Sequence, residues 1–128
     1  MKRQKLLRRL ASVGCGVALA VAVVVAAGCR SHHVEITVVN QTGAAIELLE
    51  VDYPNASFGA DSIAAGAEFH YRIQIQGSGA LKAQYTIGGK VEQVTGPRVF
   101  EGQQGSLRIV LLPEGKAEMV PLLTPKGQ

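Results

Sequence analysis

Strict alternation of apolar and polar residues most limits the folds open to this chain. From residue 68 to residue 76 every second position holds a large apolar side chain, namely Phe69, Tyr71, Ile73 and Ile75. A period of two places those side chains on one face of an extended strand. Residues 34–38 and 81–87 repeat the pattern. At least three strands with one buried face are therefore expected.

Turn residues separate these strands. Gly88-Gly89 suits a tight hairpin, because both central residues of a type I′ turn need positive φ. Residues 40–43, 77–79 and 113–116 are further turns, and no stretch after Cys29 has a useful helical period. The pattern predicts an all-β, antiparallel sandwich of seven or eight short strands, with residues 117–123 as a last edge strand.

The segment of residues 45–53 changes phase. Ile46 and Leu48 share one parity, whereas Leu49, Val51 and Tyr53 share the other. A β-bulge near Leu48-Leu49 would bring both sets to the core side. Because bulges are frequent at sheet edges, we expect this segment to be an edge strand.

The N-terminal segment has the composition of an export signal. Five of the thirteen Lys and Arg residues lie among the first nine positions, and residues 10–28 carry no charge. A basic head followed by an apolar helix is typical of such signals. The nineteen uncharged residues also approach the roughly 20 that span a bilayer. An uncleaved membrane anchor is therefore the alternative.

Ala26-Ala27-Gly28-Cys29 resembles the lipobox of bacterial lipoprotein precursors. Small residues before the cysteine let an extended backbone enter the peptidase groove. The resemblance implies cleavage before Cys29 and lipidation of its side chain, although the family usually has leucine where Ala26 stands. Arg30 follows the cysteine, where aspartate would favour the inner membrane. The implied location is the outer membrane, facing the periplasm, if the source has two membranes.

Removal of the signal changes what the composition implies. The whole chain has a net charge of +3, but the 100 residues from Cys29 onward carry eight basic and ten acidic residues, a charge of −2. Nucleic-acid binding loses its electrostatic basis. That part contains a single cysteine, so no internal disulfide is expected. The expected layout is a signal at 1–28, a tether at 29–33, one sandwich domain at 34–123 and a tail at 124–128.

Residues 34–51 and the run of residues 62–69 resemble the strand-turn-strand pattern of bacterial immunoglobulin-like sandwich domains. In those folds a loop of small residues with glycine often precedes a long alternating strand. The chain has no tryptophan and lacks the paired cysteines of antibody domains. The resemblance therefore implies a fold and carries no function with it.

Residues for catalysis are scarce. His70 is the only histidine outside the tether region, and alternation places it on the polar face of a strand, so we expect no catalytic residue. His32-His33 with Glu35 offers three metal ligands, but neighbours in an extended chain point to opposite sides, and a polar tether is favoured over a metal site. The acidic residues near the bulged strand are interpreted as solvated charges rather than a glycosidase pair or a calcium site; they are Glu47, Glu50, Asp52 and Asp61.

Aromatic residues give the one candidate for binding. Phe69, Tyr71 and Tyr85 take core positions by alternation, whereas Tyr53 and Phe58 flank a single loop. That loop either contacts a partner or folds back to cap the sandwich. The sequence thus predicts a lipid-anchored envelope protein with a non-catalytic interaction domain for another envelope protein. The alternative is a module that binds a glycan, a peptide or a metal.

Overall fold

The computed structural model describes residues 32–125. The predicted signal, Cys29, most of the tether and the last three residues lie outside this part. Eight strands follow one another, with one short 3-10 helix, η1 (Pro113–Gly115), before the last: β1 (Val34–Asn40), β2 (Ile46–Tyr53), β3 (Ala56–Ile63), β4 (Glu68–Ile73), β5 (Gly79–Ile87), β6 (Lys90–Val99), β7 (Gln104–Leu111) and β8 (Ala117–Thr124). The prediction of an all-β chain with seven or eight short strands is confirmed.

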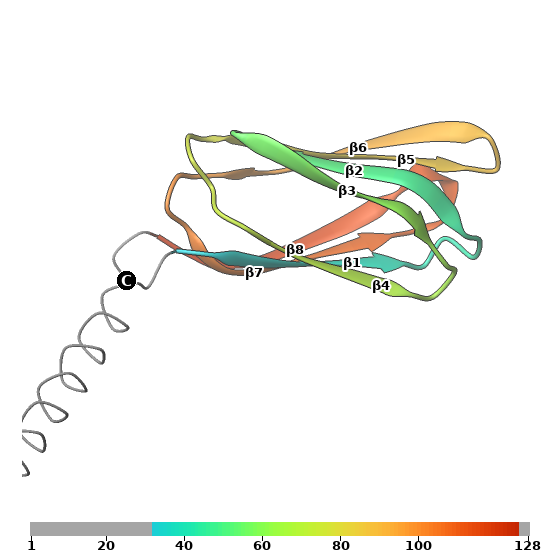
Figure 1. The fold of residues 1–128 in the computed structure, drawn as a ribbon, viewed down its shortest axis with the longest axis horizontal. Helices are drawn as coiled ribbons and strands as arrows, with labels where there is room; N and C mark the ends of the chain where they lie inside the picture. The colour runs from blue at the N-terminus through green and yellow to red at the C-terminus, as the bar shows by residue number, and fades with distance from the viewer. Residues whose placement is uncertain (1–31, 126–128) are drawn as a thin grey trace, which may run out of the picture. The chain divides into compact units, whose positions relative to one another are not determined.

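The strands form two four-stranded sheets that pack face to face (Figure 1). One sheet has the order β4-β1-β7-β8, and the other has the order β3-β2-β5-β6. Neighbouring strands are antiparallel except for β1 and β7, which run parallel. The expectation of a wholly antiparallel sandwich was therefore wrong at one pair, because alternation fixes the buried face of a strand but not its neighbour.

Alternating side chains from both sheets fill the space between the layers. β1 contributes Val34, Ile36 and Val38, and the other main contributors are β2, β5 and β7. Each side chain of this size contributes about 1.5–3 kcal/mol when it leaves water. Packing of the two inner faces therefore supplies most of the stability of a domain that has no disulfide.

Asn40 ties three segments together at one end of the sandwich. Its side chain is fully buried, and its amide donates to the carbonyls of Ala44, Ile63 and Ala64 at 2.8–3.2 Å. Its Oδ1 atom accepts from the backbone N–H and the hydroxyl of Thr42. Both the β1–β2 connection and the β3–β4 connection are thereby held to the end of β1.

Each sheet has two edge strands, and the edges meet in pairs. β3 lies beside β4 on one side of the sandwich, and β6 lies beside β8 on the other. β8 is an edge strand as predicted, but β2 is a central strand between β3 and β5. The edge position expected for residues 45–53 was therefore wrong. A bulge also occurs inside a sheet where two flanking strands can follow its distortion.

Candidate interaction site

The predicted bulge in β2 is present. Glu47 pairs with Thr86 and Glu50 pairs with Gln84 of β5, so Leu48 and Leu49 together lie opposite one residue. Leu48 adopts a left-handed backbone conformation with a φ of 53°. This backbone conformation shifts the alternation of buried and exposed side chains by one residue, so that Leu49 faces the core.

Leu48 does not join the core. The sequence analysis expected the apolar residues before and after the bulge to face the core. Ile46 and Leu49 are buried, but Leu48 is 65% exposed. The physical reason is that a bulge opposes two residues to one, and only one of the two can face the opposite sheet. The phase change in the sequence was interpreted correctly, but its consequence for Leu48 was not.

The position of Leu48 is unfavourable for the isolated domain. A left-handed conformation costs a residue with a Cβ roughly 1–2 kcal/mol. An exposed leucine gains little from burial to offset that strain. Strained residues of this kind concentrate at functional sites, because the surrounding fold holds them in place. Leu48 is therefore the first candidate for a functional residue.

A hollow of about 340 Å³ lies around Leu48 on the outer face of β2 and β3. We define the bulge patch as the outward-facing residues that line it, namely Leu48, Glu50, Ser57, Gly59 and Asp61. A side chain at Gly59 would overlap the carbonyl oxygen of Leu49. Glycine is thus required where β3 passes the bulge, and its small size keeps the hollow open.

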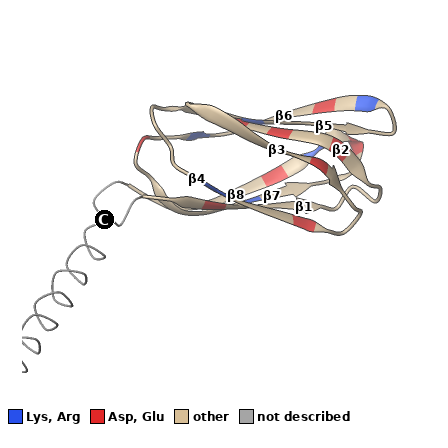
Figure 2. Ribbon diagram, in the orientation of Figure 1, with Lys and Arg blue, Asp and Glu red and all other residues tan. Residues whose placement is uncertain are grey.

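The bulge patch is acidic. β2 and β3 together contain Glu47, Glu50, Asp52 and Asp61 and no lysine or arginine (Figure 2). A hydrogen bond with Asp52 and repulsion by its charge, with a smaller effect of burial, raise the pKa of Glu50. The folded domain therefore gathers negative charge around an exposed apolar side chain. That combination suits a ligand that is itself basic and apolar.

The aromatic loop expected at Tyr53 and Phe58 is wrong as a loop. Tyr53 pairs with Ala56, so the connection is a two-residue hairpin turn, and Phe58 lies inside β3 with only 5% of its surface exposed. Its ring stacks on that of Tyr71, with centroids 4.6 Å apart and an interplanar angle of 10°. Burial gives Phe58 a structural position, whereas Tyr53 is half-buried.

The four rings Tyr53, Phe58, Phe69 and Tyr71 form an aromatic cluster between β3 and β4. Alternation assigned Tyr71 to the core, but its side chain is 44% exposed, because β4 is an edge strand and no further strand covers the ring in the part of the chain that the structure describes. The open side of the sandwich between β3 and β4 thus presents an aromatic surface.

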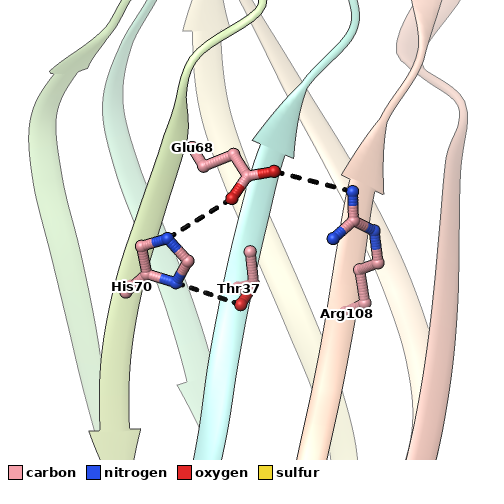
Figure 3. A network of polar contacts seen from close by, with 4 residues as sticks. All are labelled: Thr37, Glu68, His70 and Arg108. Atoms are coloured by element: carbon pink, nitrogen blue, oxygen red, sulfur yellow. Dashed lines mark hydrogen bonds and ion pairs between the residues drawn. The ribbon is translucent and has the colours of Figure 1, made fainter.

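His70 belongs to a polar network on the outer face of the other sheet (Figure 3). Its Nδ1 atom lies 3.1 Å from the hydroxyl oxygen of Thr37, and its Nε2 atom lies 3.3 Å from a carboxylate oxygen of Glu68. Glu68 in turn lies 3.7 Å from Arg108. The imidazole is 65% exposed, and charges in water act weakly on one another, so the network is a solvated cross-strand ladder rather than a preorganised site.

Two of the three potential metal ligands near the tether have other partners. The Nδ1 atom of His32 lies 3.2 Å from the amide oxygen of Gln104, and Glu35 pairs with Arg72. Within residues 32–125, no group of three or more His, Cys, Asp or Glu side chains is arranged to hold a metal ion. Cys29 lies outside the described residues.

Comparison with known proteins gives a fold and no function. No protein-family profile and no curated protein sequence matches the chain. Its structure is similar to the NMR structure of a protein from Eubacterium rectale, with a TM-score of 0.50 and 15% sequence identity. The similarity covers 76% of this chain and 92% of the other. At this identity the likeness concerns the sandwich fold alone.

Proposed function

We propose that this chain is an envelope lipoprotein whose sandwich domain binds another envelope protein without catalysing a reaction. The observation that carries the proposal is Leu48, a strained and largely exposed leucine at the centre of the bulge patch. Burial of Leu48 by a partner would explain why the chain has a residue there that lowers the stability of the free domain. Full burial of a leucine contributes about 1.5–3 kcal/mol, enough to offset the strain.

The proposed anchor is a lipid on Cys29. Support for it comes from the sequence, in which a basic head, an apolar run and three small residues precede the cysteine. Among residues 32–125, no helix is long and apolar enough to cross a membrane. We further propose the outer membrane as the residence, on the basis of Arg30, and an immunoglobulin-like class for the sandwich, on the basis of its two four-stranded sheets.

The anchor is tested by metabolic labelling with a radioactive fatty acid. Wild-type protein should take up the label and migrate as a processed chain, and a Cys29→Ala variant should remain unlabelled and unprocessed. An unlabelled wild-type protein of full precursor mass would contradict lipidation and favour the uncleaved anchor. Fractionation of the two membranes, on the same cells, then tests the proposed residence.

The interaction is tested by in-cell crosslinking of the full chain, followed by mass spectrometry of the captured protein. Leu48→Lys should reduce capture at least tenfold, because it replaces an apolar contact by a positive charge that repels a basic partner. Leu122 provides a matched control, since it is 70% exposed on β8 but has no strained backbone. Equal capture by wild type, Leu48→Lys and Leu122→Lys would exclude the bulge patch as the interface.

A second candidate function is glycan binding, and the exposed ring of Tyr71 is the observation that favours it. An exposed aromatic face backed by a stacked partner, here Phe58, can pack against the apolar face of a sugar. Titration of the purified chain with soluble cell-wall oligosaccharides tests this function. Binding that is lost in Tyr71→Ala and retained in Leu48→Lys would favour the glycan over the protein partner.

A further inference from the structure

The four edge strands differ in how well they resist pairing with another chain. β6 contains Pro97 and β8 contains Pro121, and proline lacks the N–H that an added strand would need. β4 carries Glu68, His70 and Arg72, all of which contact charged partners on its own sheet. Charged side chains along an edge also discourage pairing. Three of the four edges are therefore protected.

β3 is the exception. Its eight residues include no proline, lysine or arginine, and its one charged residue is Asp61. Most of its side chains are small, so they leave the backbone accessible along the edge. An edge of this kind offers a row of N–H and C=O groups to an incoming strand.

The surfaces on either side of the β3 edge specify what such a strand would contain. Side chains of an added strand alternate between the two faces of the sheet. On the outer face they would meet Leu48, Glu50 and Asp61 of the acidic bulge patch. On the inner face they would meet the exposed side of Tyr71 and the edge of the aromatic cluster.

We propose that the free edge of β3 accepts an extended strand of a partner protein, with basic residues at alternate positions and apolar residues between them. This inference rests on the proposed interaction function and names its surface. Charge complementarity selects the basic face of the partner strand, and the aromatic cluster selects its apolar face. The bulge then has a role, because it holds Leu48 on the outer face, where side chains of the added strand can reach it across the small residues of β3.

The test uses the full chain in mild detergent and a blocked ten-residue peptide in which lysine alternates with valine. Hydrogen–deuterium exchange is followed by mass spectrometry. At a peptide concentration about ten times the dissociation constant, exchange in residues 56–63 should slow by about tenfold. A peptide with glutamate in place of lysine is the matched control and should give no protection, because it repels the acidic face. Raising the salt concentration should weaken binding of the lysine peptide.

A proline in β3 tests the backbone contribution. Ala56 and Ser57 are both exposed and occupy adjacent positions in the register with β2, so they have opposite parity. In an antiparallel ladder only one of them donates its N–H to β2. One of the variants Ala56→Pro and Ser57→Pro should therefore unfold more easily, and the other should keep the wild-type melting curve and lose peptide binding at least tenfold.

Protection confined to β3 and lost in the folded proline variant would support the inference. Protection of β4, β6 or β8, no protection at any strand, or unchanged binding by the folded proline variant would overturn it. Capture of a partner that depends on Leu48 but not on the β3 proline would leave the proposed interaction standing and refute strand addition alone.

Discussion

Replacement of Leu48 by asparagine should stabilise the domain. Leu48 has a φ of 53°, and asparagine tolerates this left-handed conformation better than leucine does. Relief of the strain is worth up to roughly 1.5 kcal/mol. The side chain is 65% exposed, so loss of its buried third removes about 0.7 kcal/mol of the roughly 2 kcal/mol that full burial would provide. The net expectation is a gain of about 0.5–1 kcal/mol.

Leu122 separates strain from exposure in this experiment. It is 70% exposed on β8, and its backbone lies outside the left-handed region. Leu122→Asn loses the same small burial and also places a poor strand former in a strand, so it should destabilise by about 1 kcal/mol. The two substitutions therefore share their chemistry but have opposite expected signs.

Urea unfolding of the full chain in mild detergent, followed by circular dichroism, measures both effects. For a domain of this size, 1 kcal/mol corresponds to roughly 4–8 °C in melting temperature, so thermal scans provide a second measurement. If both asparagine variants lost equal stability, the argument from backbone strain would be refuted, and Leu48 would be an ordinary packing residue. A stabilised Leu48→Asn variant that no longer captured the partner would instead show strain retained for binding.

Three further predictions concern single side chains. Asn40→Ala should destabilise the domain by about 3 kcal/mol in urea unfolding, because it removes the buried hydrogen bonds that join two loops to β1. Tyr85→Phe should leave stability at pH 7 unchanged or raise it by about 1 kcal/mol, because the buried Tyr85 hydroxyl has no hydrogen-bond partner among the described residues. Burial, and to a smaller extent the charge of Glu92, raise the pKa of Tyr85 above its ordinary value near 10. The wild-type protein should therefore lose stability as the pH rises through the folded-state pKa of Tyr85, and the phenylalanine variant should lose less. Glu50→Gln should raise the melting temperature at pH 7. Asp52 raises the pKa of Glu50, so the wild-type domain loses stability as the pH rises from the ordinary value of 4.5 through the raised pKa, and glutamine has no such charge. A difference between the two proteins that persisted at pH 3 would argue against this cause.

Much of the fold could be predicted from local pattern. The hairpin at Gly88-Gly89 is present, with both glycines at positive φ and Ile87 paired with Lys90. The strands with clean alternation are present, although the one expected over residues 68–76 ends at Ile73. They could be located because alternating apolar residues face the opposite sheet. These features depend on residues close together in the sequence, where geometry leaves few alternatives.

β3 could not be predicted, and the reason is physical. It follows the bulge of its neighbour, so its two large buried residues, Phe58 and Ile63, are five positions apart and have opposite parity. Neither the period of a strand nor that of a helix describes this spacing. The segment was therefore interpreted as a loop around Tyr53 and Phe58, although the ladder with β2 is continuous.

The bulge in β2 explains both the irregular sequence of β3 and the exposure of the bulge patch. A phase change in one strand of a sheet must be matched by its neighbour, and β3 matches it with small residues and with Gly59 against the Leu49 carbonyl. The bulge leaves Leu48 no place in the core, and the small residues that accommodate the bulge leave the β3 edge bare. One local irregularity therefore produces both the exposed leucine and the unprotected edge. If a partner strand binds there, Gly59→Ala should lower both the stability of the domain and its affinity for the strand. Leu48→Asn should instead raise the stability and lower the affinity.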